Sequence, residues 1–131
     1  MKSAFRAAVA AVGLGVVLFA APAFAQDKEP AMMGKTAMGP VLTDAKGMTL
    51  YVFDKDTAGK SACNGPCATN WPPLMAHASA KPMGKYTVVT RDDGSRQWAY
   101  DGKPLYTWAK DTKPGDTTGD GVNNVWHVAK P

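Results

Sequence analysis

One short segment recurs in similar form in this chain, at residues 47–57 and again at residues 102–112. The two starting positions differ by 55 residues, and the same difference separates Trp71 from Trp126 further along. Two unrelated loops would not agree at both ends of such a stretch without a gap. The sequence therefore predicts that the domain is a duplicated unit with pseudo-twofold symmetry.

The first residues have the pattern of a secretory signal peptide. Lys2 and Arg6 precede an apolar run over residues 7–21, and an Ala-Phe-Ala sequence that ends at Ala25 precedes a polar stretch. This pattern predicts cleavage after Ala25. The apolar run is short and rich in alanine and glycine, so we expect no membrane span. No cysteine stands at the cleavage point, so we expect no lipid anchor and a mature chain in the periplasm or outside the cell.

The charge of the mature chain gives no indication of a nucleic-acid partner. The whole chain has 15 Lys and Arg residues against 11 Asp and Glu residues, a net charge of +4. Cleavage removes Lys2 and Arg6, which lowers the net charge from +4 to +2. The remaining charges of both signs are interspersed, so we expect no binding to nucleic acid or to an anionic membrane.

The rest of the chain is typical of a small all-β domain. We expect a flexible tail over residues 26–40, which has no apolar period, and a single duplicated domain over residues 41–131. The repeat units are expected at about 42–75 and 97–131. Apolar stretches bounded by turn residues predict short antiparallel strands, joined by long loops, at 41–43, 49–54, 85–91, 96–100, 104–109 and 124–129.

Cys63 and Cys67, the two cysteines of the chain, have three residues between them. In an exported chain the pair is expected to form a disulfide, because the compartment is oxidising and the Gly-Pro sequence between them allows a turn. A loop this small stabilises the fold by about 2 kcal/mol in the chain-entropy model. One helical turn is expected within residues 63–70, ending before Pro72.

A copper site, or a site for another metal, is the alternative function for the same pair. Its ligands would be Cys63 and Cys67 with His77 or His127. Methionine thioethers also suit copper(I), although the methionines of this chain are scattered rather than closely paired. After cleavage they are, in chain order, Met32, Met33, Met38, Met48, Met75 and Met83. A mobile tail and gap-filling in the core explain them more simply.

The repeated segment contains the pattern Tyr-x-aromatic-x-x-Asp. Its members are Tyr51, Phe53 and Asp56 in the first copy and Tyr106, Trp108 and Asp111 in the second. A Trp-Pro-Pro-Leu sequence follows the cysteines at Trp71, and the chain closes with Trp-His-Val at residues 126–128. With these features the chain resembles the bacterial secreted-repeat family of predicted lipoproteins that carry a Yx(F/W/Y)xxD motif. The resemblance covers residues 42–131 and implies export and a repeated fold unit, but no biochemical activity is established for that family.

Two interpretations of the motif remain open. In the structural interpretation, the aromatic side chains fill the core and each Asp carboxylate accepts backbone N–H groups in the turn that follows. In the functional interpretation, Tyr51, Phe53, Tyr106 and Trp108 meet at the pseudo-twofold axis and line a small apolar pocket. Such a pocket would suit a lipid, a hydrocarbon or a quinone-like molecule.

No catalytic constellation is evident. The chain lacks a glycine-rich phosphate loop, a G-x-S-x-G elbow and an H-E-x-x-H pair, and His77 and His127 are its neutral-pH bases. We therefore expect a monomeric, non-catalytic binding or envelope-associated protein without a cofactor. The sequence does not identify its envelope partner or small-molecule ligand.

Overall fold

The computed structural model describes residues 29–131. The expected signal peptide, residues 1–25, lies outside this range. The strands are β1 (Met32–Thr36), β2 (Gly39–Thr43), β3 (Tyr51–Phe53), β4 (Tyr86–Thr90), β5 (Arg96–Tyr100), β6 (Lys103–Pro104) and β7 (Trp126–Val128). The helices are α2 (Pro66–Asn70) and the 3-10 helix η3 (Val122–Asn124). No helix within the described range is long and apolar enough to cross a membrane.

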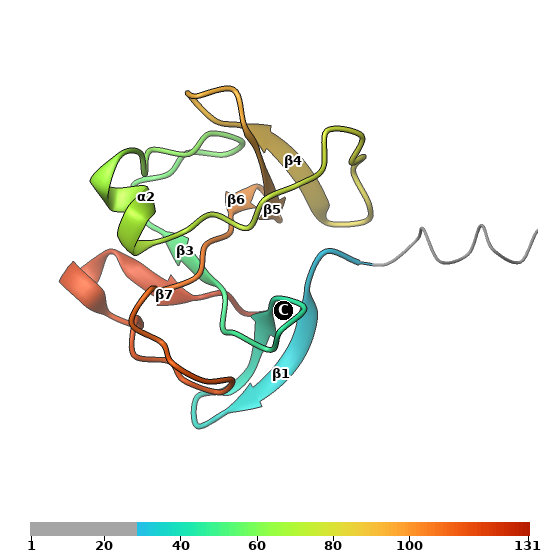
Figure 1. Ribbon diagram of the computed structural model, residues 1–131. Helices are drawn as coiled ribbons and strands as arrows, with labels where there is room; N and C mark the ends of the chain where they lie inside the picture. Colours follow the sequence, from blue (N-terminus) through green and yellow to red (C-terminus); the bar gives the residue numbers. More distant parts are fainter. Residues whose placement is uncertain (1–28) are drawn as a thin grey trace, which may run out of the picture.

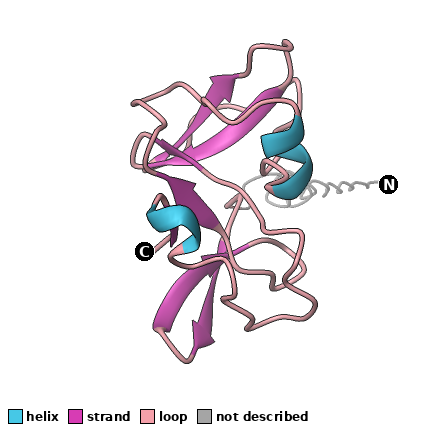
Figure 2. Ribbon diagram, turned by 90° about the vertical axis from the view of Figure 1, so that its left-hand side faces the viewer, coloured by secondary structure: helices cyan, strands magenta, loops and turns pink. Residues whose placement is uncertain are grey.

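The strands form three small antiparallel sheets, which confirms the predicted all-β class. β1 pairs with β2, β3 pairs with β7, and β4, β5 and β6 form the third sheet in that order. The β1–β2 hairpin lies at one end of the molecule and the β4–β5 hairpin at the other, with β3 and β7 between them (Figure 1 and Figure 2). The predicted hairpin over residues 85–100 is present as β4 and β5.

Tyr51 and Tyr106, which are equivalent in the two repeats, lie side by side at the centre. The N–H of Tyr51 donates to the C=O of Tyr106 at 2.7 Å, and the N–H of Tyr106 donates to the C=O of Tyr51 at 3.0 Å. Beside this pair, each repeat contacts the other. Tyr51 of the first repeat pairs with Val128 of the second, and Tyr106 of the second bridges to Pro73 of the first. Positions 73 and 128 also differ by 55, so the duplicated domain has the predicted pseudo-twofold symmetry.

Alternation along the repeated strand divides the core into two clusters. Tyr51 and Tyr106 face one cluster, which also contains Val41, Cys63, Trp71, Trp126 and Val128. Leu50 and Leu105, one position earlier, face the other cluster, which also contains Ala31, Leu42, Tyr86 and Ala129. Adjacent residues of a strand point to opposite faces, so the same short segment of each repeat contributes to both clusters.

Residues 32–40, which the sequence placed in a flexible tail, form the β1–β2 hairpin. Thr36 stabilises the turn, because its Oγ1 accepts the N–H of Met38 at 3.0 Å and donates to the C=O of Gly39 at 3.0 Å. Gly39 has a φ of +90°, which glycine adopts without a steric penalty. The lack of an apolar period led to the wrong prediction of a tail. No β1 side chain is buried, and the strand depends on backbone pairing with β2.

Three predicted strands are at most half as long as expected. Within 49–54, Tyr51–Phe53 forms β3. Within 104–109, Pro104 belongs to β6, and the backbone at Tyr106 then leaves β5 to meet β3 and Pro73. Within 124–129, Trp126–Val128 forms β7 after η3 ends. The helical turn predicted near the cysteines is present as α2.

Candidate functional site

The tyrosines and aspartates of the motif form two pairs that join the repeats. The Tyr51 hydroxyl donates to Asp111 Oδ2 at 2.7 Å, and the Tyr106 hydroxyl donates to Asp56 Oδ2 at 2.7 Å. Tyr51 and Asp56 belong to the first copy, whereas Tyr106 and Asp111 belong to the second. Each tyrosine therefore finds its acceptor in the other repeat.

Each aspartate also holds the loop that follows it in its own repeat. Asp56 Oδ1 accepts the N–H of Ala62 at 2.7 Å. Asp111 Oδ1 accepts both the N–H of Thr118, at 3.1 Å, and its hydroxyl, at 2.6 Å. These contacts are the ones that the structural interpretation of the motif describes.

Burial changes the acidity of these groups. Burial raises the pKa of Tyr51, and the hydrogen bond to the Asp111 carboxylate raises it further. Burial likewise raises the pKa of Tyr106, and the Asp56 carboxylate acts in the same direction. Burial also raises the pKa of Asp56, against the hydrogen bonds that this carboxylate accepts. Both phenols therefore stay protonated near neutral pH and act as donors.

The other aromatic side chains form a continuous stack. Trp71 and Trp126 lie at its centre, with ring centroids 3.7 Å apart and ring planes 3° apart. Phe53 stacks on Trp126 at 4.2 Å, and Trp108 stacks on Trp71 at 3.9 Å. Because Phe53 and Trp108 are equivalent positions, the stack has the same pseudo-twofold symmetry as the fold.

The motif aromatics therefore contact other aromatic rings and do not surround an open space at the pseudo-twofold axis. Tyr51 and Tyr106 have no exposed surface, and their rings meet Trp71 and Trp126 edge-on at 5.4 and 5.1 Å. The two ends of the stack, Phe53 and Trp108, are partly buried. This geometry favours the structural interpretation of the motif at the axis.

A buried arginine that the sequence did not indicate lies behind Tyr106. Arg91 Nη1 donates to Ser61 Oγ at 3.0 Å and to Gln97 Oε1 at 2.8 Å, and Nη2 donates to the C=O of Cys63 at 2.6 Å. Ser61 Oγ lies 2.6 Å from the Tyr106 hydroxyl. The guanidinium thereby joins the cysteine loop to β5 and to the Tyr106 hydroxyl. In the sequence, Arg91 showed only as the last residue of a predicted strand.

Cys63 and Cys67 form the predicted disulfide. Neither sulfur is a thiolate, the form that binds copper. His77 lies exposed in a loop, whereas His127 on β7 places Nε2 2.8 Å from Asp54 Oδ2. Among residues 29–131, no three His, Cys, Asp or Glu side chains are grouped closely enough to hold a metal ion. The fold does not bring the ligands of the copper alternative together.

Within residues 29–131, strand β1 has an open outer edge. The N–H of Leu42 on β2 donates to the C=O of Ala129 at 2.8 Å, and its C=O accepts the N–H of Leu50 at 2.9 Å. Leu42 therefore directs its backbone groups away from β1, and its cross-strand partner Met33 directs its own groups outward. Lys35, two residues further, has the same orientation. In the described part of the chain β2 is the one strand paired with β1.

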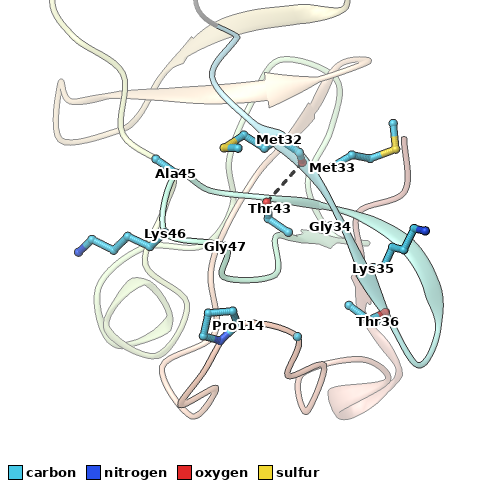
Figure 3. Close-up of a pocket in the computed structure, with 11 residues that line it drawn as sticks. Met32, Met33, Gly34, Lys35, Thr36, Thr43, Ala45, Lys46, Gly47 and Pro114 are labelled. Carbon is cyan, nitrogen blue, oxygen red and sulfur yellow. Dashed lines mark hydrogen bonds between the residues drawn. The ribbon is translucent and has the colours of Figure 1, made fainter.

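The same hairpin carries most of the exposed apolar side chains. Within residues 29–131, the large hydrophobic side chains that are exposed are Met32 (57%), Met33 (67%), Met38 (37%) and Met75 (53%). The first three belong to the β1–β2 hairpin. Met32 and Met33 extend to opposite sides of β1 (Figure 3), as neighbouring residues of a strand do. The two thioethers therefore do not face a common ligand position.

A cavity of about 470 Å³ lies beside β1. Its lining, drawn in Figure 3, consists of residues 32–36, Thr43, residues 45–47 and residues 114–115. Lys35 and Lys46 are its charged members, and this lining contains no carboxylate side chain. The edge of β1 thus combines outward backbone groups, apolar thioethers and positive charge.

The sequence contained one signal for this strand. When the 55-residue offset is extended upstream, residues 32–36 become equivalent to residues 87–91 of the second repeat. A strand is predicted there, and β4 is found there. The two segments share no identical residue. Identical residues therefore could not reveal that β1 and β4 are equivalent, although the constant 55-residue offset could.

Comparison with known proteins agrees with the repeat seen in the structure. The model of a family described as a secreted repeat of unknown function matches residues 32–75 and again residues 87–130. These segments begin 55 residues apart and include β1 and almost all of β4. No curated protein and no solved structure matches the chain. The protein therefore belongs to the family of secreted repeats of unknown function.

Proposed function

We propose that the protein is a secreted, non-catalytic binding module that holds an extended segment of a partner protein along the open edge of β1. The observation that carries this proposal is the outward orientation of the Met33 and Lys35 backbone groups beside exposed methionine side chains. An extended peptide satisfies such groups by adding a strand to the sheet. The aromatic stack and the Tyr–Asp pairs form the framework behind this edge.

The surroundings of β1 define the chemistry of the partner segment. Lys35 and Lys46 line the cavity of about 470 Å³ and favour an acidic side chain. A second cavity of about 410 Å³ borders the same methionines and includes Met83, Tyr86 and Tyr100 in its lining. Its two charged side chains, Glu29 and Lys85, have opposite signs, so this lining favours an apolar over an acidic side chain. Side chains of an added strand alternate between its two sides. We therefore propose a partner segment that presents both acidic and apolar side chains along this edge, and an alternating sequence is the simplest probe of this kind.

Hydrogen exchange with a synthetic peptide tests the proposal. The probe is a short peptide in which valine alternates with glutamate. In the free protein we expect fast exchange at the Met33 amide, which points outward, and slow exchange at the Gly34 amide, which faces β2. The peptide should slow exchange at Met33 and Lys35. A version with N-methyl groups along its bonding edge should not bind, because it cannot complete the ladder.

A pair of charge variants provides the matched control. Met33→Glu places a carboxylate on the edge and should weaken binding of the acidic peptide about tenfold or more. Met75→Glu makes the same change at an exposed position outside the hairpin and should leave affinity within about twofold. Equal losses in the two variants, or binding of the N-methylated peptide, would contradict strand addition. Slower Met33 exchange at high protein concentration without peptide would assign the edge to a second copy of the chain.

A small apolar molecule at one end of the aromatic stack is the second candidate ligand. Val52, Phe53, Ala58 and Pro104 belong to the lining of a cavity of about 270 Å³. The charged members of this lining are Asp54, Asp56, Asp101 and Lys103. This volume lies slightly below the range common for small-molecule sites. A naphthoquinone probe should quench tryptophan fluorescence of the protein if it binds there. Phe53→Ala should abolish that response, whereas Trp108→Ala, at the opposite end of the stack, should preserve it.

The proposed form of the protein is an exported monomer, cleaved after Ala25, without a lipid anchor, a cofactor or a metal. The sequence pattern of residues 1–25 and membership in a secreted family support export. Native mass spectrometry of the protein purified from the periplasm, without chelator or reductant, provides the test. We expect a chain that begins at Gln26 with one disulfide and nothing attached. Added copper would favour a metal-handling protein.

A further inference from the structure

We propose that the thioethers of Met32 and Met33 are a modification site for peroxides, and that their oxidation releases the partner segment. This inference rests on the proposed function, because it concerns the regulation of the same edge. It follows from the exposure of these two side chains, from the protection of both cysteines and of Trp71 and Trp126, and from the change in polarity that oxidation produces.

Met32 and Met33 are accessible to a dissolved oxidant, with 57% and 67% of their surface exposed. The chain has two cysteines, and both are already joined in the disulfide, so no thiol competes for the oxidant. The indoles of Trp71 and Trp126 are shielded within the stack, with 4% and 2% exposed. Trp98 and Trp108 are partly buried, and three of the four exposed methionine side chains within residues 29–131 lie on the β1–β2 hairpin.

The reaction with hydrogen peroxide balances without a further reactant. The thioether sulfur attacks one peroxide oxygen, so that an S–O bond forms and the O–O bond breaks. The sulfur loses two electrons and becomes a sulfoxide. The departing hydroxide takes the proton left on the transferred oxygen and leaves as water.

Oxidation removes the apolar character of the edge. A sulfoxide is polar and accepts hydrogen bonds from water, so covering it with an apolar side chain of the partner is unfavourable. Losing the contact of one buried methionine corresponds to a decrease in affinity of about tenfold or more. The fold should be unaffected, since neither methionine belongs to the buried clusters.

The experiment combines peptide mapping with the binding assay. The purified protein is treated with hydrogen peroxide, its sulfoxides are located by mass spectrometry, and the alternating valine–glutamate peptide is titrated before and after treatment. We expect Met32 and Met33 to be oxidised before the half-buried Met48, and the affinity to fall by about tenfold or more. Methionine sulfoxide reductases should restore binding.

Met75 provides the matched control, because it is exposed to a similar extent but lies outside the hairpin. The Met75→Leu variant should remain sensitive to peroxide, whereas Met32→Leu/Met33→Leu should bind the peptide and lose that sensitivity. Unchanged affinity with sulfoxide mapped at both hairpin positions overturns the regulation. Earlier oxidation of Met48 overturns the assignment of the site. If the untreated protein does not bind the peptide, the proposed function fails, while the mapping still tests the modification site.

Discussion

At the scale of single residues, the Tyr-x-aromatic-x-x-Asp motif pairs groups that would be costly to bury alone. A buried hydroxyl without an acceptor costs about 1–3 kcal/mol, and a buried carboxylate without donors costs more. Tyr51 donates to Asp111 and Tyr106 donates to Asp56, while loop N–H groups complete each carboxylate. In this fold each tyrosine depends on the aspartate of the other copy for its acceptor. The motif therefore satisfies its buried hydroxyl and carboxylate groups only when both copies are present.

Removal of one of these carboxylates should reduce stability strongly. We expect Asp111→Ala to lower the free energy of unfolding by about 3 kcal/mol, because Tyr51 and the Thr118 amide lose their acceptor. Asp54→Ala, in the first motif but half exposed at 52%, should change it by less than about 0.5 kcal/mol. Chemical denaturation measures both values. Similar losses in the two variants would show that the motif carboxylate has no special role.

The raised pKa values of Tyr51 and Tyr106 predict a loss of stability in alkali. Below about pH 10 both phenols are protonated in the folded and unfolded chains, so their contribution is constant. Above about pH 10 the unfolded chain releases these protons while the folded chain keeps them. The free energy of unfolding should then fall by about 1.4 kcal/mol per pH unit for each tyrosine. Denaturation curves at increasing pH test this, and Tyr51→Phe should show a shallower decline.

At the scale of elements, the short helix α2 and strand β1 are stabilised by contacts with other parts of the chain. Helix α2 (Pro66–Asn70) has no side-chain cap and no buried residue. Its loop is anchored by the disulfide and by Arg91, which donates to the C=O of Cys63. Strand β1 likewise depends on backbone pairing with β2. Such elements would not persist as isolated peptides.

Loss of the disulfide should therefore destabilise the protein without unfolding it. The double variant Cys63→Ser/Cys67→Ser should lose about 2 kcal/mol, the loop-closure contribution of so small a ring. Hydrogen exchange should increase most at α2 and at the amide of Trp71, which donates to the C=O of Cys67. A variant with unchanged stability and unchanged exchange at α2 would contradict the anchoring role.

At the scale of the whole molecule, the two repeats are interlocked. β3 of the first repeat pairs with β7 of the second, and Tyr106 bridges to Pro73 of the first. The central aromatic stack takes two rings from each repeat, with Trp71 against Trp126 in the middle. Neither repeat contains a complete core, so the repeats should not unfold separately.

This interlocking predicts a single cooperative transition. Leu50→Ala and Leu105→Ala change equivalent positions, both fully buried, and each should cost about 2–5 kcal/mol. Each variant should lower hydrogen-exchange protection in both repeats, including the β4–β5 hairpin and β3. Unfolding curves from fluorescence and circular dichroism should coincide. Two separate transitions, or a loss of protection confined to the altered repeat, would contradict interlocked repeats.

Local features of the fold were predictable because they depend on residues close in sequence. The β4–β5 hairpin, the helical turn near the cysteines and the Cys63–Cys67 disulfide each follow from turn residues, proline or spacing. The repeat itself was evident from the 55-residue offset. Strand β1 was missed because it buries no side chain, so its pairing leaves no apolar period in the sequence.

The sequence by itself determined a duplicated all-β domain and the identity of its repeated aromatic and acidic residues. Only the tertiary structure decided which partners these residues have. Tyr51 could have met Asp56 in its own repeat, yet its acceptor is Asp111, because backbone pairing between Tyr51 and Tyr106 places each strand against the other repeat. The open edge of β1 was likewise decided by packing, since β2 directs the Leu42 backbone toward Leu50 and Ala129. Such long-range pairings depend on three-dimensional proximity, which a linear pattern does not encode.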